Sequence, residues 1–411
     1  MTYYDQPIEI VSGRGCRVTD ADGREYLDFF AGVLTNSLGY DVAEVREAVE
    51  RQLRSGITHT STLYLIRSQV ELAEKIAARS GISDARVFFT NSGTEANEAA
   101  LLLATNLRRS NTILAVRGSY HGRTYATMGA TGIRSWSPTA LNPLNVSFLH
   151  SGDRLRGVLS GLSDADYVRA AVEDLREVLV TTTAGDVACL IAEPIQGVGG
   201  FVHGPDGLFA AWKEVLDEHG ILFVSDEVQT GWGRTGAHFW GYQAHGMTPD
   251  LLTFAKGIGN GFALAGVVGR AEVMDAVSGV SFSTFGGNPL ATAAGNAVLD
   301  YIVDHDLQAN AAHVGAILHA GLRAIESPII GEVRGRGLML AVELVKPGTV
   351  EPDLAATARV FEACRDNGLL VGKGGLYGNT IRMGPPLTLS EGEAKEGLDI
   401  LTAVIGSPVR T

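Results

Sequence analysis

The chain has 411 residues, of which 45% are hydrophobic and 19% are charged, the composition of a globular protein with more sequence than one compact core usually holds. Its formal net charge of −13 disfavours non-specific binding to nucleic acid or to an anionic membrane surface. The three cysteines are widely separated, no apolar window has the length of a membrane span, and the first residues form no signal peptide, so we expect a cytoplasmic protein.

Short apolar runs alternate with helical periodicity along the sequence. We predict a strand at 26–30 and a helix at 42–54, then strands at 86–90, 112–116, 187–192, 221–225, 251–255 and 263–268, with helices such as 95–108 and 208–218 between them. Helices at 290–302 and 309–324 follow, then a glycine-rich strand region at 333–344, a helix at 355–367 and a strand at 380–383. Such short, continuous apolar runs are typical of strands buried on both faces of a mostly parallel sheet, so the predicted fold class is α/β.

The sequence also suggests a division into two domains. We predict that residues 1–45 begin a smaller α+β domain, that residues 46–304 form a large domain around the central sheet, and that residues 305–411 complete the smaller domain. The last section has its own alternation of strands and helices, which allows it to pack with the N-terminal segment.

One motif has the pattern of an anion site. Asn91-Ser92-Gly93-Thr94-Glu95 follows a predicted strand and opens a predicted helix. Ser92 and Glu95 fit a capping box, and Gly93 lets backbone N–H groups converge on one point. Free N–H donors and the helix dipole favour a phosphate there, although an ordinary capped helix has the same pattern.

Two acids and a lysine follow predicted central strands. Glu193, Asp226 and Lys256 each come directly after one of these apolar runs, where open α/β sheets bind ligands. A buried carboxylate needs a cationic partner such as a protonated ring nitrogen, and a desolvated amine becomes a nucleophile. Each residue alone is explained as well by a salt bridge, a helix cap or a solvated charge. Together with the anion site, they are the anchors that pyridoxal phosphate needs.

Further candidates contribute aromatic and cationic groups. In Tyr120-His121-Gly122-Arg123, the phenol ring could stack on a flat cofactor and Arg123 could bind a carboxylate, whereas the alternative is a turn with an exposed arginine. Arg382 is one charge in an otherwise apolar strand, which indicates that it meets a fixed anion.

A dinucleotide site must also be considered. Gly231–Gly236 matches G-x-G-x-x-G after a predicted strand, and Asp250 follows. The residues after the glycines are poor helix formers, and Asp250 precedes its strand rather than ending it. The dehydrogenase interpretation is therefore rejected.

In this order and spacing, the motifs resemble those of class III aminotransferases, the omega-aminotransferase branch of the aspartate aminotransferase fold (fold type I). The resemblance extends from about residue 23 to residue 398. It rests on Ser92–Asn97, Tyr120–Gly122, Glu193–Gly197, Asp226–Gly231, Lys256-Gly257 and Thr284–Pro289.

The resemblance implies a set of roles, with pyridoxal phosphate as cofactor and no metal. Lys256 would hold the cofactor as a Schiff base and act as general acid and base, while Asp226 would keep the ring nitrogen protonated. The other implied cofactor contacts are Ser92, Gly93, Thr94, Tyr120, His121, Glu193, Val228, Gln229 and Thr284, and the implied substrate contacts are Arg382, Arg123, Tyr64 and Val33. Thr284 would come from the partner subunit of a homodimer whose active sites are shared; pairing of dimers into a tetramer is left open.

Departures from the family pattern bear on the substrate. Members that use 2-oxoglutarate often have a gating glutamate where this chain has Val198, and ornithine-specific members have a tyrosine at Val33. Val198 and Leu369–Gly372 are most similar to the alanine–glyoxylate branch, whereas Arg123 is more typical of 4-aminobutyrate and acetylornithine enzymes. We expect ping-pong transfer from alanine or an omega-amino acid, such as 4-aminobutyrate or beta-alanine, to pyruvate, glyoxylate or 2-oxoglutarate. The alternative is a phospho-lyase, racemase or decarboxylase with the same cofactor anchors.

Overall fold

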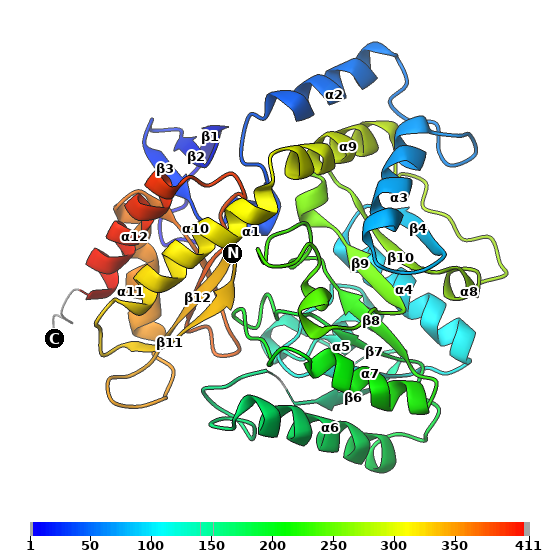
Figure 1. Ribbon diagram of the computed structural model, residues 1–411. Helices are drawn as coiled ribbons and strands as arrows, with labels where there is room; N and C mark the ends of the chain where they lie inside the picture. Colours follow the sequence, from blue (N-terminus) through cyan, green and yellow to red (C-terminus); the bar gives the residue numbers. More distant parts are fainter. Residues whose placement is uncertain (1–2, 140, 151, 407–411) are drawn as a thin grey trace.

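The computed structural model describes residues 3–139, 141–150 and 152–406, and its centre is a seven-stranded sheet (Figure 1). The strand order is β4-β10-β9-β8-β7-β5-β6. The bounds are β4 (Ala85–Thr90), β5 (Thr112–Val116), β6 (Asn145–Leu149), β7 (Cys189–Ala192), β8 (Leu222–Asp226), β9 (Leu251–Phe254) and β10 (Ala265–Arg270). The predicted α/β class with a mostly parallel sheet is confirmed.

One strand of this sheet runs against the others. β10 is antiparallel to both β4 and β9, whereas β9-β8, β8-β7, β7-β5 and β5-β6 are parallel pairs. Two reversals cancel, so β4 runs in the same direction as β9. The carboxyl ends of all the strands except β10 therefore meet at one edge, where ligands bind in sheets of this type.

Helices cover both faces of the sheet, as the alternation of side chains along β5 shows. Leu114 and Val116 pack in a core with α6 (Asp164–Thr181) and α7 (Leu208–Glu218). Ile113 and Ala115 point the other way, into a core with α4 (Gly93–Arg108) and α5 (Tyr125–Ala130). Successive strand residues face opposite sides of a sheet, and here both sides are apolar, which explains the continuous hydrophobic runs.

Two four-stranded sheets lie beside the central sheet, on the left in Figure 1. The first has the order β1 (Ile10–Arg14), β2 (Arg17–Asp20), β3 (Glu25–Asp28) and β13 (Leu369–Leu370). The second has the order β11 (Ile330–Arg336), β12 (Met339–Leu344), β15 (Thr380–Met383) and β14 (Gly372–Gly374). The parallel pairing of β3 with β13 joins strands from opposite ends of the chain. The domain boundaries near residues 45 and 304 stay a prediction.

The remaining helices pack around these sheets. They are α1 (Ala31–Leu34), α2 (Ala43–Arg54), α3 (Arg67–Arg79), α8 (Ala271–Met274), α9 (Pro289–Asp304), α10 (Leu307–Arg323), α11 (Leu354–Asp366) and α12 (Glu391–Gly406), with short 3₁₀ turns η1 (Arg134–Trp136), η2 (Gly241–His245) and η3 (Lys256–Ile258). The glycines of Gly231–Gly236 lie in a loop before η2 and open no helix, so they do not form a dinucleotide-binding turn.

Gly39 and Tyr40 have a structural role in the loop after α1. Gly39 has a φ of +81°, and a Cβ there would lie 2.2 Å from the Gly15 carbonyl oxygen. The Tyr40 hydroxyl donates to Asp28 Oδ2 at 2.6 Å. These contacts fasten the loop after α1 to β3 and to the turn between β1 and β2.

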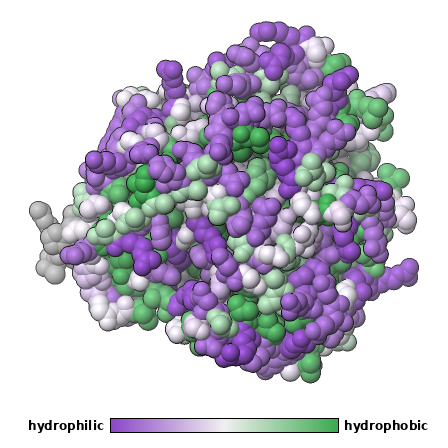
Figure 2. All heavy atoms as spheres, in the orientation of Figure 1, coloured by the Kyte–Doolittle hydropathy of each residue, from purple (hydrophilic) through white to green (hydrophobic). Residues whose placement is uncertain are grey.

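The surface is mixed. On the face shown in Figure 2, hydrophilic residues predominate and apolar residues form small separate patches. Within residues 3–139, 141–150 and 152–406, no helix has the length and apolar character needed to cross a bilayer. Large exposed apolar side chains occur in two loop segments, where Leu65 is 94% exposed and Val280 is 96% exposed.

Candidate functional site

A cavity of about 360 Å³ lies where the chain leaves the carboxyl ends of β4, β7, β8 and β9. Its lining brings together residues that are far apart in the sequence. Ten predicted site residues line it: Ser92, Gly93, Thr94, Tyr120, His121, Glu193, Asp226, Val228, Gln229 and Lys256. Among the residues that the structure describes, no group of three or more metal-ligating side chains is found.

The start of α4 forms one end of this cavity. Ser92 caps the helix by accepting from the Glu95 N–H at 3.2 Å. The return bond of a capping box does not form, because Glu95 Oε2 accepts from the N–H of Asn91 at 2.7 Å, one residue before the cap. The N–H groups of Gly93 and Thr94 therefore stand at an open helix start, which favours an anion.

Gly93 is closely packed at the wall of the cavity. A Cβ at this position would lie 3.0 Å from both methyl carbons of Val228 and 3.6 Å from Ala255 Cβ. Tyr120 also lines the cavity and makes an edge contact with Trp136, with ring centroids 5.4 Å apart. The space is thus bordered by apolar and aromatic groups that suit a flat ring.

Asp226 is the centre of a buried hydrogen-bond network. Its Oδ2 accepts from Asn97 Nδ2 and lies against His121 Nδ1, each at 2.7 Å, and its Oδ1 accepts from the Val228 N–H at 3.1 Å. Asn97 is itself fixed by the Thr253 hydroxyl, which donates to its Oδ1 at 2.7 Å. A buried carboxylate held in this way keeps its orientation toward the cavity.

Glu193 lies beside this network. Its two carboxylate oxygens accept from the N–H groups of Tyr120 and Gly197, both at 2.8 Å. Burial and the neighbouring charge of Asp226 raise the pKa of Glu193 to about 7. Glu193 thus joins the loop after β5 to the turn after β7 and titrates close to neutral pH.

Lys256 faces the cavity from the end of β9 in a strained conformation, with a φ of +48°. Left-handed backbone is uncommon for a residue with a side chain and clusters at functional sites. Desolvation lowers the pKa of Lys256 below its ordinary value, an effect that the charges of Asp226 and Glu193 oppose. A lowered pKa increases the share of neutral amine, the nucleophilic form.

Arg382 lies outside the cavity lining, and its surroundings differ from the expectation of a fixed anion. Its Nη1 donates to the Gly197 carbonyl at 2.8 Å and its Nη2 to the Lys373 carbonyl at 3.0 Å. The guanidinium carbon lies 5.2 Å from the Phe30 ring centroid and 5.6 Å from that of Phe201. Carbonyl oxygens and aromatic faces replace the anion as partners of the buried charge.

The other predicted contacts are not brought into the cavity. Arg123 and Thr284 are exposed, Tyr64 is 70% exposed and Val33 is 42% exposed. Val33 lies in α1, whose four residues all have positive φ between +47° and +65°. The next residue, Thr35, does line the cavity.

The turn that contains Val198 is held from the C-terminal sheet. The Val198 carbonyl accepts from the Gly375 N–H at 3.0 Å, and the Gly200 carbonyl accepts from Arg334 Nε at 2.8 Å. Together with the bond from Arg382 to Gly197, three carbonyls of this turn have donors from outside it. The turn is therefore a fixed support for Arg382.

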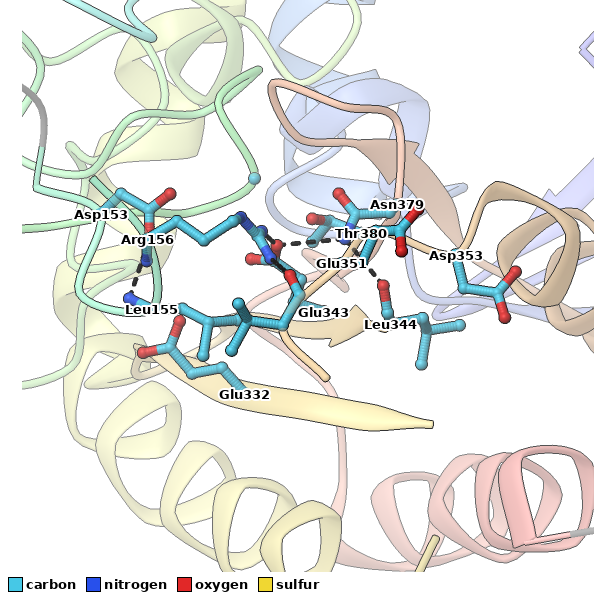
Figure 3. A network of polar contacts seen from close by, with 12 residues as sticks. Asp153, Leu155, Arg156, Glu332, Glu343, Leu344, Glu351, Asp353, Asn379 and Thr380 are labelled. Carbon is cyan, nitrogen blue, oxygen red and sulfur yellow. Dashed lines mark hydrogen bonds and ion pairs between the residues drawn. The ribbon is translucent and has the colours of Figure 1, made fainter. Parts of the chain in front are cut away.

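Arg334 belongs to a buried charge network. Figure 3 shows Arg156, Glu332, Glu343 and Asn379 of this network. Arg334 and Arg156 both pair with Glu343, and Arg334 also pairs with Glu332 at 2.6 Å. Asn379 donates to Glu343 Oε1, the oxygen that also pairs with Arg156, at 3.1 Å. A buried arginine paired on several sides is held rigidly, so the network fixes the donor that holds Gly200.

Sequence reasoning missed two of these supporting residues. Asn97 ends the Ser92–Asn97 motif, and its position one helical turn after Gly93 is the signal that places it on the same side of the helix. The sequence contains one indication for Arg334: it is a charged residue within a predicted strand, as Arg382 is. Its partners come from segments whose proximity is a property of the fold alone.

Comparison with known proteins identifies the family. The family model for class-III aminotransferases matches residues 2–405, so the chain belongs to the class III aminotransferases. It is 42% identical over 397 residues to the mitochondrial alanine–glyoxylate aminotransferase 2 homolog 2 of Arabidopsis thaliana, covering 95% of this chain and 81% of that protein. It is 39% identical to the acetylornithine aminotransferase of Mycolicibacterium smegmatis, covering 98% and 95%.

A solved structure agrees with the fold. An amine transaminase from an uncultivated Pseudomonas species, in its PLP-bound form, superposes with a TM-score of 0.91 at 31% identity, covering 98% of this chain and 95% of that one. The protein is thus an enzyme of the class III aminotransferase family, whose cofactor is pyridoxal phosphate.

The residues present fit this cofactor. The cavity offers an open helix start for a phosphate, the Asp226 carboxylate for a ring nitrogen and the Lys256 amine for an aldehyde. Gln229 Oε1 and His121 Nε2 are buried and have no hydrogen-bond partner in the described part of the chain. Unpaired buried polar atoms are costly, which indicates that the cavity is shaped for a polar molecule.

Proposed function

We propose that this aminotransferase transfers the amino group of alanine or of an omega-amino acid, such as 4-aminobutyrate or beta-alanine, to pyruvate, glyoxylate or 2-oxoglutarate. The observation that carries the proposal is Arg382: within the described residues, no carboxylate forms an ion pair with this buried guanidinium. Its remaining N–H groups are available to a carboxylate brought by the substrate.

The known relatives support this range of substrates. The names of two relatives refer to alanine with glyoxylate and to acetylornithine. Val198 stands where members that use 2-oxoglutarate often have a gating glutamate, and its carbonyl accepts from the Gly375 N–H. Without a competing carboxylate in this turn, Arg382 is open to small amino and oxo acids at both stages of the reaction.

The residues of this chain would divide the work as follows. Pyridoxal phosphate, when bound, supplies an electron sink for the carbanion formed at the substrate carbon. Lys256 Nζ would act as general base and take the proton from that carbon. It would then act as general acid and deliver the proton to the cofactor. Asp226, fixed by Asn97 and His121, would hold a proton at the ring nitrogen. Arg382 would orient the substrate by its carboxylate.

We also propose a homodimer whose partner supplies Thr284 to the phosphate end. Thr284 is exposed, and Phe282 and Phe285 beside it expose apolar rings, which is the composition of a subunit contact. A cytoplasmic location is proposed on the sequence composition alone.

The test is spectroscopic. We would record the absorbance of the purified protein and add alanine, 4-aminobutyrate and beta-alanine one at a time, without an acceptor. Conversion of the cofactor band to that of the amine form by one donor would identify the nitrogen source. Return of the band with pyruvate, glyoxylate or 2-oxoglutarate would identify the acceptor.

Other outcomes would contradict the proposal. A cofactor band that no donor converts would indicate a lyase, racemase or decarboxylase. The absence of a band after pyridoxal phosphate is added would show that Lys256 is not the cofactor lysine.

A further inference from the structure

The N-terminal segment is fastened to the C-terminal part of the chain next to Arg382. Tyr3 and Tyr4 both pack on Phe361 of α11, with ring centroids 5.0 Å and 4.4 Å from it. The N–H of Asp5 donates to Glu362 Oε1 at 3.0 Å. Several independent contacts therefore hold this segment in one place on α11.

Tyr3 shares its neighbours with Arg382. The Lys373 N–H donates to the Tyr3 hydroxyl oxygen at 2.7 Å, while the Lys373 carbonyl accepts from Arg382 Nη2 at 3.0 Å. The Tyr3 ring is parallel to Phe30, with centroids 6.3 Å apart, and Phe30 is also the ring over which Arg382 lies. The Tyr3 phenol and the Arg382 guanidinium therefore lie beside each other, because both contact the backbone of Lys373 and the ring of Phe30.

The Tyr3 hydroxyl keeps a hydrogen to donate. It accepts from Lys373, and in the described part of the chain no acceptor for its own hydrogen is found. Burial raises the pKa of Tyr3 above its ordinary value, although the charge of Arg382 opposes the shift, so the phenol stays protonated near neutral pH. The Tyr3 residue is 46% exposed, so a molecule arriving at Arg382 can reach it.

We propose that Tyr3 is a substrate-binding residue, whose hydroxyl donates to the carboxylate that Arg382 binds and thereby favours carboxylate-bearing substrates. The inference rests on the proposed function of Arg382. A guanidinium and a hydroxyl side by side can satisfy both oxygens of a carboxylate, and Tyr3 would add a donor whose position is fixed in advance. The N-terminal segment would then determine substrate selectivity.

The experiment compares two adjacent tyrosines in the holoenzyme. Tyr3→Phe removes the hydroxyl, which is both the proposed donor and the acceptor of the Lys373 N–H. Tyr4→Phe is the matched control, because Tyr4 stacks on Phe361 and shares no hydrogen bond with Arg382 among the described residues. We would measure KM and kcat for the donor identified above and the inhibition constant of propionate, a carboxylate that cannot react. Thermal unfolding and the cofactor spectrum would show that each variant is folded and loaded.

For Tyr3→Phe we expect KM for the donor and the inhibition constant of propionate to rise about tenfold, the loss expected for one hydrogen bond to a charged group, with kcat nearly unchanged. Tyr4→Phe should leave all of these values at those of the wild type. Equal effects of the two substitutions, or a fall in kcat alone, would overturn the assignment, because a structural role predicts them.

Arg382→Ala separates this inference from the proposed function. If that variant no longer binds propionate while Tyr3→Phe binds it as the wild type does, the role of Tyr3 is wrong and that of Arg382 stands. If Arg382→Ala binds propionate normally, the carboxylate site itself is wrong and both proposals fail.

Discussion

At the cofactor end of the site, Asp226 and Glu193 accept hydrogen bonds from helix α4 and from the loop after β5, whereas at the other end Arg382 donates to two backbone carbonyls from separate segments. The cofactor end depends on acidic side chains that stand at fixed positions in sequence motifs. The other end depends on which backbone segments the fold brings together. The comparison shows why family motifs identify the cofactor readily and the substrate poorly.

The largest effect would come from the cofactor end. Replacing Lys256 with Ala should lower kcat by at least about 10⁴-fold, because the nucleophile and the acid–base group are lost together. Steady-state assays at saturating donor and acceptor would measure this, with circular dichroism to establish that the fold is retained. An active Lys256→Ala variant would refute the proposed roles.

Asn97 tests whether the network around Asp226 matters as a unit. Asn97→Leu keeps the side-chain size but removes a donor to Asp226 and the acceptor of Thr253, and we expect a loss of about 1–3 kcal/mol in the free energy of unfolding. We expect kcat to fall roughly tenfold as the carboxylate loses its orientation. Asn106→Leu on the exposed side of α4 is the control. If the two variants behave alike, Asp226 does not depend on Asn97.

Arg334 tests the substrate end. Arg334→Lys preserves the charge but cannot donate to Gly200 and pair with both acids at once, so the turn that supports Arg382 should loosen. We expect KM for carboxylate substrates to rise severalfold while the cofactor spectrum stays that of the wild type. Arg17→Lys, at an exposed ion pair, serves as control. A changed cofactor spectrum would show that the two ends of the site are not independent.

The last prediction concerns the pH dependence of stability rather than turnover. The pKa of Glu193 is raised from 4.5 to about 7 in the folded protein. The unfolded chain therefore ionises this group first, and its contribution to stability is fully present below pH 4.5 and is lost as the pH rises through about 7. In cofactor-free protein, the free energy of unfolding of the wild type minus that of Glu193→Gln should fall over this interval. A rising difference would show that the pKa is lowered instead.

Much of the architecture could be predicted from the sequence. The runs 112–116, 208–218 and 380–383 coincide with β5, α7 and β15, because apolar periodicity alone determines such elements. The helices α3 and α6 and the strands β1, β2 and β6 were not predicted, since their exposed faces dilute the apolar pattern. The reversed direction of β10 also could not be predicted, because strand direction depends on tertiary pairing.

The site shows the same limit. The strand-end positions of Glu193, Asp226 and Lys256 follow from local sequence, and the structure places all three at one cavity. The partners of Arg382 do not follow from local sequence, because they belong to a turn near residue 197 and to the short strand β14, which contains Lys373. A carbonyl oxygen carries no sequence signature, so a site made of backbone acceptors is found only in three dimensions.

The pairing of β4 with β10 has a consequence for synthesis on the ribosome. Thr90, at the end of β4, pairs with Ala265, so the strand before the proposed phosphate-binding helix start has its partner only after most of the central region has been translated. Contacts so distant in sequence form slowly. A nascent chain would therefore acquire its cofactor late, and chains truncated before residue 265 should accumulate without any capacity to retain pyridoxal phosphate.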